Sequence, residues 1–134
     1  MAYEAVIIEL LGNAGDPVRY TVADGVLIPK GSLMYLSGDR EATISSAQGQ
    51  IFVGIATTEK VASDGITALA VYTNGIFDLT DEGAGITLGD MVKLGGVNTI
   101  ATQDEAGVNA AAETVGLALE AATGSEVIAV RIMK

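Results

Sequence analysis

The chain carries a similar pattern twice, about sixty residues apart. In each copy an apolar residue, two spacers and a glycine precede a short apolar run, a Val-Gly-apolar-Ala element follows, and a further glycine then leads into another apolar run. The order of elements is kept while the loops between them differ in length, which is typical of a duplicated structural unit. The matching segments are residues 28–36 and 86–94, residues 53–56 and 115–118, and the glycines Gly65 and Gly124.

The duplication predicts how the chain is organised. At 134 residues and 13.6 kDa the chain has the length of one domain. We expect a single β domain over residues 21–134, built from two similar halves at about 25–79 and 83–134. Residues 1–20 lie outside the duplication and are predicted to form an N-terminal arm or an edge strand.

Short apolar runs separated by glycine and small polar residues predict an all-β fold with at most a short helix. Seventeen glycines divide the chain into runs with the short spacing of a β-rich domain rather than a helical bundle. We therefore expect a compact, barrel-like domain. The predicted strands are residues 18–23, 33–36, 51–57, 66–73, 75–79, 91–94 and 127–133.

Three local segments need separate interpretation. Asn74-Gly75 is a strong hairpin signal, because a type I′ turn needs positive φ at both central residues. Residues 5–11 fit either a strand or one short helix. Residues 110–122 have helix propensity, but residues 115–119 align with the strand-like residues 53–57, so we predict a strand there and leave 106–112 as a loop or a helical turn.

The repeated glycines have a structural interpretation. Gly31 and Gly89 are expected to supply turns that other residues enter only with strain. Gly54 and Gly116 lie inside predicted strands, where a glycine permits a bulge or a close approach of two backbones. Such bends would curl a sheet into a barrel.

No feature of the sequence predicts catalysis, a cofactor or a metal. The chain has no cysteine and no histidine, so it lacks thiolate ligands and the commonest general base. Ser32 near Lys30, and Ser63 beside Asp64, are ordinary turn chemistry. Residues 78–83 (DLTDEG) resemble a weak calcium cluster without the ligand spacing of an EF-hand, and we prefer to interpret them as a solvated acidic turn.

The charge excludes two classes of partner. Seven basic residues stand against seventeen acidic ones, a net charge of −10, and residues 78–126 hold nine acids and one base, a net of −8. Such a chain repels phosphate, so we expect no binding to nucleic acid or to an anionic membrane. The apolar fraction is nevertheless 49% with a mean hydropathy of +0.43, and we interpret this surplus as a subunit interface.

The N-terminal arm is the strongest candidate for a binding segment. It is apolar, precedes the duplicated core and ends in a run of turn-forming residues. It could reach a partner or form an extra strand on the protein's own sheet, and these two readings carry equal weight. Its candidate binding residues are Tyr3, Glu4, Val6, Ile7, Ile8, Leu10 and Leu11.

These repeated motifs over residues 18–134, together with the short acidic chain, resemble the small capsid cement or head decoration proteins of tailed bacteriophages. The resemblance implies a β-clip or β-tulip domain that forms a homotrimer on the outer capsid surface of the virion. It implies that the trimer bridges major capsid protein subunits, that the arm adds a strand to the capsid protein, and that assembly occurs in the host cytoplasm.

Two other functions stay open at this point. The first is a β-clip-type module that binds a carbohydrate or a peptide, although the chain has only four tyrosines and two phenylalanines to offer. The second is an enzyme that works with carboxylates alone.

Overall fold

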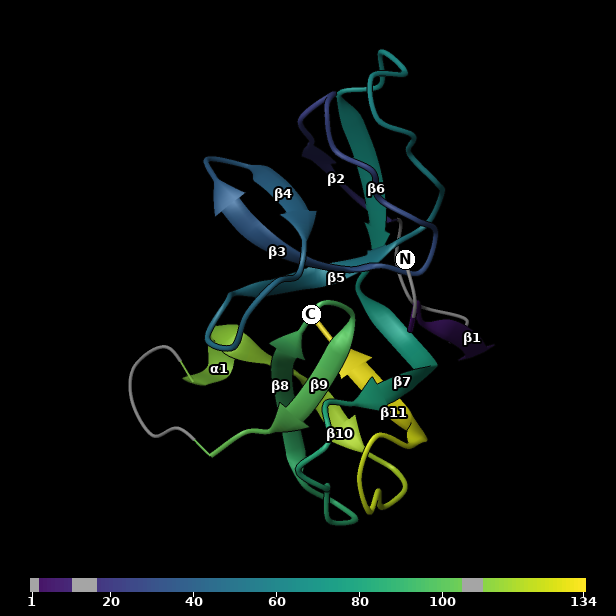
Figure 1. Ribbon diagram of the computed structural model, residues 1–134, viewed down its shortest axis with the longest axis vertical. Coiled ribbons are helices and arrows are strands. Elements are labelled where there is room, and N and C mark those ends of the chain that lie inside the picture. Colours follow the sequence, from purple (N-terminus) through teal and green to yellow (C-terminus); the bar gives the residue numbers. More distant parts are fainter. Residues whose placement is uncertain (1–2, 11–16, 105–109) are drawn as a thin grey trace.

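The computed structural model describes residues 3–10, 17–104 and 110–134, and over these residues the chain is all-β, as predicted (Figure 1). One short helix, α1, interrupts the strands. The elements in order are β1 Val6–Glu9, β2 Val18–Thr21, β3 Leu33–Gly38, β4 Glu41–Ile44, β5 Phe52–Ala56, β6 Ala68–Tyr72, β7 Asn74–Asp81, β8 Met91–Gly96, β9 Thr99–Thr102, α1 Ala110–Glu113, β10 Thr114–Ala118 and β11 Val127–Met133.

The strands form two closed barrels of five strands each, which lie one above the other in Figure 1. Barrel one contains β2 to β6, in the order β2-β4-β3-β5-β6. Barrel two contains β7 to β11, in the order β7-β11-β10-β8-β9, and the pairing of β9 with β7 closes it. β1 is added outside barrel two, along the edge of β7.

The two barrels have the same strand connectivity. β2 to β6 correspond in order to β7 to β11, and each barrel has four antiparallel pairings and one parallel pairing. The parallel pairing joins Thr21 to Glu41 in barrel one and Thr80 to Thr99 in barrel two. An isolated bridge follows the first strand in each case, Ile28 with Lys60 and Ile86 with Ala122.

Equivalent glycines let the strands of each barrel approach closely. At Gly54, with φ of 148°, a Cβ atom would lie 2.5 Å from the carbonyl oxygen of Tyr72. At Gly116 a Cβ atom would overlap the carbonyl oxygen of Arg131. The pairing register also shifts beside both glycines, between Met34 and Tyr35 opposite β5 and between Thr114 and Gly116 opposite β8. Each barrel is therefore bent where a side chain would not fit.

The glycines that open the two repeats also adopt one conformation. Gly31 has a φ of 86° and Gly89 has a φ of 85°. The N–H of Gly31 donates to the carbonyl oxygen of Ala56, at the end of β5, at 2.9 Å. The N–H of Gly89 donates to the carbonyl oxygen of Ala118, at the end of β10, at 3.0 Å. Both glycines therefore start a barrel strand from a left-handed turn.

The predicted hairpin at Asn74-Gly75 is wrong. β6 and β7 belong to different barrels, and only Thr73 separates them, so the chain crosses from one barrel to the other instead of reversing. Of the pair only Gly75 has a positive φ, 137°. A Cβ atom there would lie 2.9 Å from the carbonyl oxygen of Glu9, so this glycine makes room for β1.

The ambiguous segments are strands. β1 runs through the N-terminal apolar run, and β10 occupies residues 114–118 in place of a longer helix, as the repeat predicted. The short α1 covers Ala110–Glu113 and so includes residues 110–112 of the predicted 106–112 loop or helical turn. Residues 106–109 lie outside the described residues. β4 and β9 are additional strands that the sequence did not predict.

The barrels share an apolar interface. Leu33, Phe52 and Ile55 of barrel one belong to the same buried cluster as Phe77 and the other core residues of barrel two. The β8–β9 turn reinforces this contact, because the buried Asn98 side chain accepts a hydrogen bond from Leu33 N–H at 2.9 Å and its own N–H donates to Ser45 Oγ at 2.9 Å. The barrels thus pack as one unit.

The close approach at Gly54 gives a stability prediction. Gly54→Ala should lower the free energy of unfolding by about 2 to 4 kcal/mol, because the new methyl group meets the β6 backbone and the positive φ is strained. Gly25→Ala is the matched control, because no atom lies within 4 Å of its Cβ position, and it should change stability by less than about 0.5 kcal/mol. Urea unfolding measures both, and equal effects of the two substitutions would contradict the role of Gly54.

Candidate functional site

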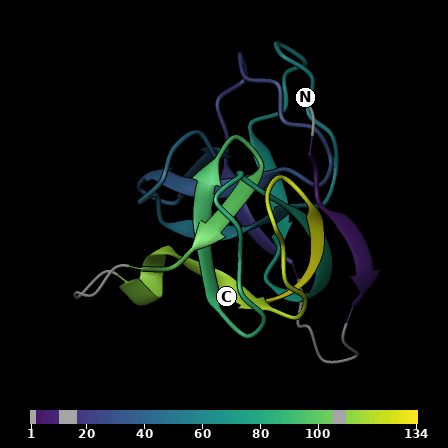
Figure 2. The same cartoon turned by 60° about the horizontal axis from the view of Figure 1, so that its bottom comes forward.

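Residues 3–10 of the N-terminal arm include β1, an edge strand on barrel two, whereas residues 18–20 of the predicted arm belong to β2 of barrel one. β1 pairs antiparallel with β7, with Val6 opposite Asp78 and Ile7 opposite Phe77, and the register becomes irregular before Glu9. Ahead of the strand, Ala5 N–H donates to the carbonyl oxygen of Gly31 at 2.6 Å. Figure 2 shows β1, in purple, along the outer side of the molecule.

The arm exposes a row of apolar side chains. Tyr3 and Val6 are each 58% exposed, Ile8 is 53% exposed and Leu10 is 44% exposed. Glu4 is partly buried, and Leu11 lies outside the described residues. Among the described strands β1 pairs only with β7, so its other edge is open for the addition of a further strand.

Ile7 differs from its neighbours because it also lines a small crevice beneath β1. The crevice has a volume of about 20 Å³, close to the space that one water molecule needs, and is lined by residues of both barrels, including Ile55, Tyr72 and Phe77. Ligand pockets for small molecules usually have about 300 to 1,000 Å³. The crevice is therefore better described as an imperfect fit beneath the edge strand than as a sugar-binding site.

A largely apolar face of barrel two continues from β1. Ile76, Arg131, Leu117 and Met91 lie opposite one another across β7, β11, β10 and β8, and so share one side of the sheet. We call this surface the outer face; it also includes the neighbouring Val6, Asp78, Ala129 and Met133. Arg131 is exposed and forms no ion pair with any described residue.

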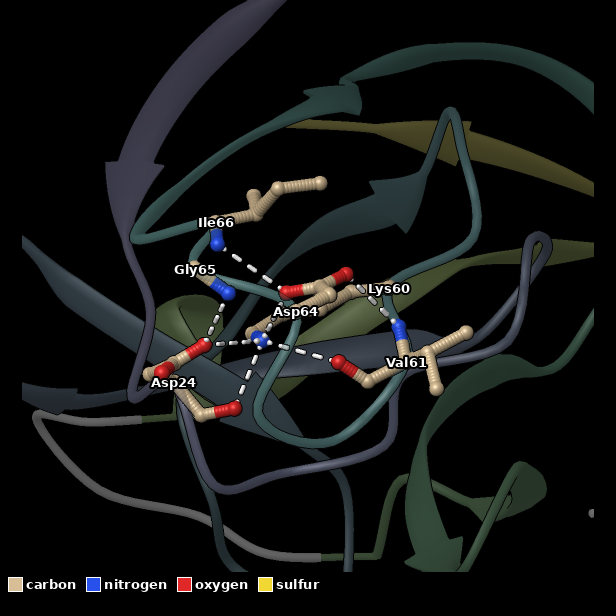
Figure 3. Close-up of polar contacts among 6 residues, drawn as sticks. All are labelled: Asp24, Lys60, Val61, Asp64, Gly65 and Ile66. Atoms are coloured by element: carbon tan, nitrogen blue, oxygen red, sulfur yellow. Dashed lines mark hydrogen bonds and ion pairs between the residues drawn. The ribbon is translucent and has the colours of Figure 1, made fainter.

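The most concentrated polar cluster lies on barrel one, around Lys60 (Figure 3). The Lys60 side chain is 0% exposed. Its Nζ donates to Asp64 Oδ1 at 2.8 Å, to the carbonyl oxygen of Asp24 at 2.7 Å and to that of Val61 at 3.2 Å, and it lies 3.4 Å from Asp24 Oδ1. Asp24 Oδ1 in turn accepts from Gly65 N–H at 2.7 Å. The ammonium group is thus fully used in joining two loops.

The Lys60 cluster shifts the pKa of its members. Burial by itself lowers the pKa of Lys60, but the hydrogen bonds and charges of Asp64 and Asp24 together outweigh it and raise that pKa above its usual value. The hydrogen bond from Lys60, aided by the backbone N–H of Ile66, lowers the pKa of Asp64 to about 2. Both groups are therefore held in their charged forms, so the cluster serves as a structural ion pair.

The remaining predicted chemical residues have structural contacts. Ser32 Oγ donates to the carbonyl oxygen of Pro29 at 2.7 Å in a buried turn. Asp81 corrects the expectation of a solvated acidic turn at residues 78–83, because it ends β7 and is only 1% exposed. Across the described ranges no group of three or more acidic side chains is placed to hold a metal ion, and no helix is long and apolar enough to cross a membrane.

The sequence predicted the N-terminal arm as a binding segment, and it predicted neither the outer face nor the Lys60 cluster. The outer face depends on strand register, which no single segment reveals. The repeat contains one indication of Lys60: it forms the isolated bridge with Ile28, whereas barrel two has the uncharged Ala122 at the equivalent position.

A family model described as phage cement protein matches residues 12–132, which is most of the chain. No curated protein matches the chain.

The Lys60 cluster predicts a component of acid sensitivity. Because the pKa of Asp64 is lower in the folded state than its ordinary 3.8, its contribution to stability is present above pH 3.8 and is lost as the pH falls toward 2. Asp64→Asn should therefore lower the urea midpoint at pH 7, and the difference from the unmodified protein should shrink between pH 4 and 2. The exposed Asp39→Asn is the control. A difference for Asp64→Asn that stays constant from pH 7 to 2 would rule out this linkage.

Proposed function

This chain belongs to the phage cement protein family, and we propose that it binds the outer capsid surface as a homotrimer and stabilises the head by bridging major capsid protein subunits. The family supports a structural role associated with the capsid. The trimer, the capsid protein as direct partner, and binding in the host cytoplasm during assembly are parts of the proposal.

The exposed edge strand β1 is the observation that carries the proposal. Its second edge has no strand partner among the described residues, and the side chains of Val6 and Ile8 are exposed. A strand of the capsid protein can pair with that edge, while alternate side chains enter pockets on the partner. Since β1 is already ordered on β7, addition of a strand here does not require the arm to fold on binding.

The outer face of barrel two supports self-association. It is mainly apolar, and its charged groups Asp78 and Arg131 have opposite signs. Such a surface can bury its apolar residues against a second copy while Arg131 of one subunit meets Asp78 of the next. In this arrangement the interface between subunits would bury part of the large apolar fraction of the chain.

Binding only to the assembled lattice would stabilise it by mass action. A ligand present at a thousandfold excess over its dissociation constant contributes about 4 kcal/mol per site. A trimer that engages several sites gains further, because each bound arm raises the effective concentration of the others. The acidic segment 78–126, with its net charge of −8, is then available to face solvent or basic patches on the capsid.

The arm hypothesis is tested by binding to expanded capsids that lack the decoration protein. Deletion of residues 1–12 should abolish co-sedimentation with such capsids. Ile8→Asp should weaken it at least tenfold, because a carboxylate replaces an exposed apolar contact on β1. Leu36→Asp is the matched control, since Leu36 is an exposed apolar residue that lies on β3 of barrel one, away from the Lys60 cluster. Undiminished binding by the deletion variant would contradict the hypothesis that the arm binds the capsid.

The trimer is tested by light scattering. The protein should have a solution mass of three times 13.6 kDa. Arg131→Glu should shift it toward the monomer by placing like charges in the interface, whereas Arg19→Glu on β2 should not. Combining Asp78→Arg with Arg131→Asp should restore the trimer. A clean monomer for the unmodified protein, or a trimer indifferent to Arg131→Glu, would refute this interface.

A further inference from the structure

Asp81 is a buried carboxylate that the proposed function does not use. It ends β7 and is 1% exposed. Its Oδ2 accepts a hydrogen bond from Gly85 N–H at 2.9 Å. Its Oδ1 is also buried and has no hydrogen-bond partner among the described residues. A charged oxygen in this situation is costly unless something positive meets it.

The duplication shows that the fold does not require a carboxylate at this position. The equivalent residue in barrel one is Val22, which follows β2 as Asp81 ends β7. Val22 N–H donates to the carbonyl oxygen of Thr67 at 3.0 Å, and Asp81 N–H makes the matching bond to Glu126 at 2.9 Å. Since Val22 is also 1% exposed, an apolar side chain satisfies the same backbone geometry.

The two barrels also differ at the residue that forms the isolated bridge. In barrel one Lys60 forms the isolated bridge with Ile28 and places its ammonium group among backbone and carboxylate oxygens. In barrel two the equivalent bridge joins Ile86 to Ala122, which has no charge to offer. Gly85 lies between Asp81 and this bridge. Its N–H donates to Asp81 Oδ2, and a Cβ atom added to Gly85 would lie 3.4 Å from the carbonyl oxygen of Ala122.

We propose that Asp81 Oδ1 binds a hard metal cation, calcium, at the end of barrel two. The loops at residues 82–85 and 123–126 lie against Asp81, since Gly85 N–H donates to Asp81 Oδ2 and Asp81 N–H donates to the carbonyl oxygen of Glu126, and their oxygen atoms are the candidate further ligands. A Cβ atom on Gly124 would lie 3.2 Å from the carbonyl oxygen of Gly83, and one on Gly83 would lie 3.5 Å from Ser125 Oγ. Both glycines have positive φ, 132° and 134°, a backbone conformation that other residues adopt only with strain.

The donor set fixes the class of ion and the strength of binding. Carboxylate, carbonyl and hydroxyl oxygens suit calcium, and not the softer metals that prefer nitrogen or sulfur. A single buried carboxylate completed by backbone oxygens and water corresponds to weak sites, with dissociation constants of about 10⁻⁴ to 10⁻³ M. The site is distinct from the arm and the outer face, so its failure would leave the proposed cement function unaffected.

The experiment is thermal unfolding of the full chain in EDTA and in calcium chloride at constant ionic strength, together with calorimetric titration of calcium. Calcium at tenfold its dissociation constant should shift the folding equilibrium about elevenfold and raise the unfolding temperature. Asp81→Asn should abolish this effect, because the amide keeps an acceptor for Gly85 N–H but loses the charge. Asp81→Val, which installs the barrel-one residue, should also abolish it.

Asp39→Asn is the matched control, since it removes one exposed acidic charge from barrel one. It should keep the full calcium response, which separates site binding from general screening of an acidic protein. ¹⁵N NMR should place the calcium-dependent shifts at Gly83 and Gly85. Equal calcium responses in the unmodified protein, Asp81→Asn and Asp39→Asn, or no response in any of them, would overturn the proposal.

Discussion

The close approach of strands at Gly54 and Gly116 is the constraint on which the rest of the structure depends. At each position the neighbouring strand's carbonyl group occupies the space of a side chain. This lets β5 lie against β6, and β10 against β11, at the angle that closes a five-stranded barrel. Without closure each half would be an open sheet with unprotected edges. The two small barrels, their shared apolar interface and the edge of β7 on which β1 pairs all depend on this closure.

The repeat and the glycines were enough to predict the fold class, and the aligned Val-Gly elements correctly favoured a strand at β10 over a helix. The hairpin at Asn74-Gly75 failed because a local turn signal carries no information about which barrel the next strand joins. β4 and β9 were missed because each has only four residues, too few to show a clear alternation of apolar and polar side chains. The arm was recognisable from its composition, whereas the outer face required the register of four strands.

The two barrels keep a common backbone and differ in their buried charges. Barrel one contains Lys60 with its two aspartates, and barrel two contains Asp81 in place of Val22. Glycine and apolar positions are shared because they determine barrel geometry, while a buried charge can change once local partners satisfy it. The arm adds to this asymmetry, because only β7 has a strand at its edge in addition to its barrel partners. The positions that the two barrels share thus determine the barrel geometry, whereas the buried charges and the added strand distinguish one barrel from the other.

The path of the chain between barrels has a consequence for the order of folding. β1 belongs to the sheet of barrel two, β2 begins barrel one, and β7 returns to lie beside β1. In the unfolded chain, pairing β1 with β7 closes a loop that contains all of barrel one, which carries a large entropic cost. Once barrel one has folded, its two ends lie close together and most of that cost has been met. We therefore expect β1 to pair with β7 after barrel one has folded, so that the exposed edge of β1 forms only on a chain whose first barrel is complete.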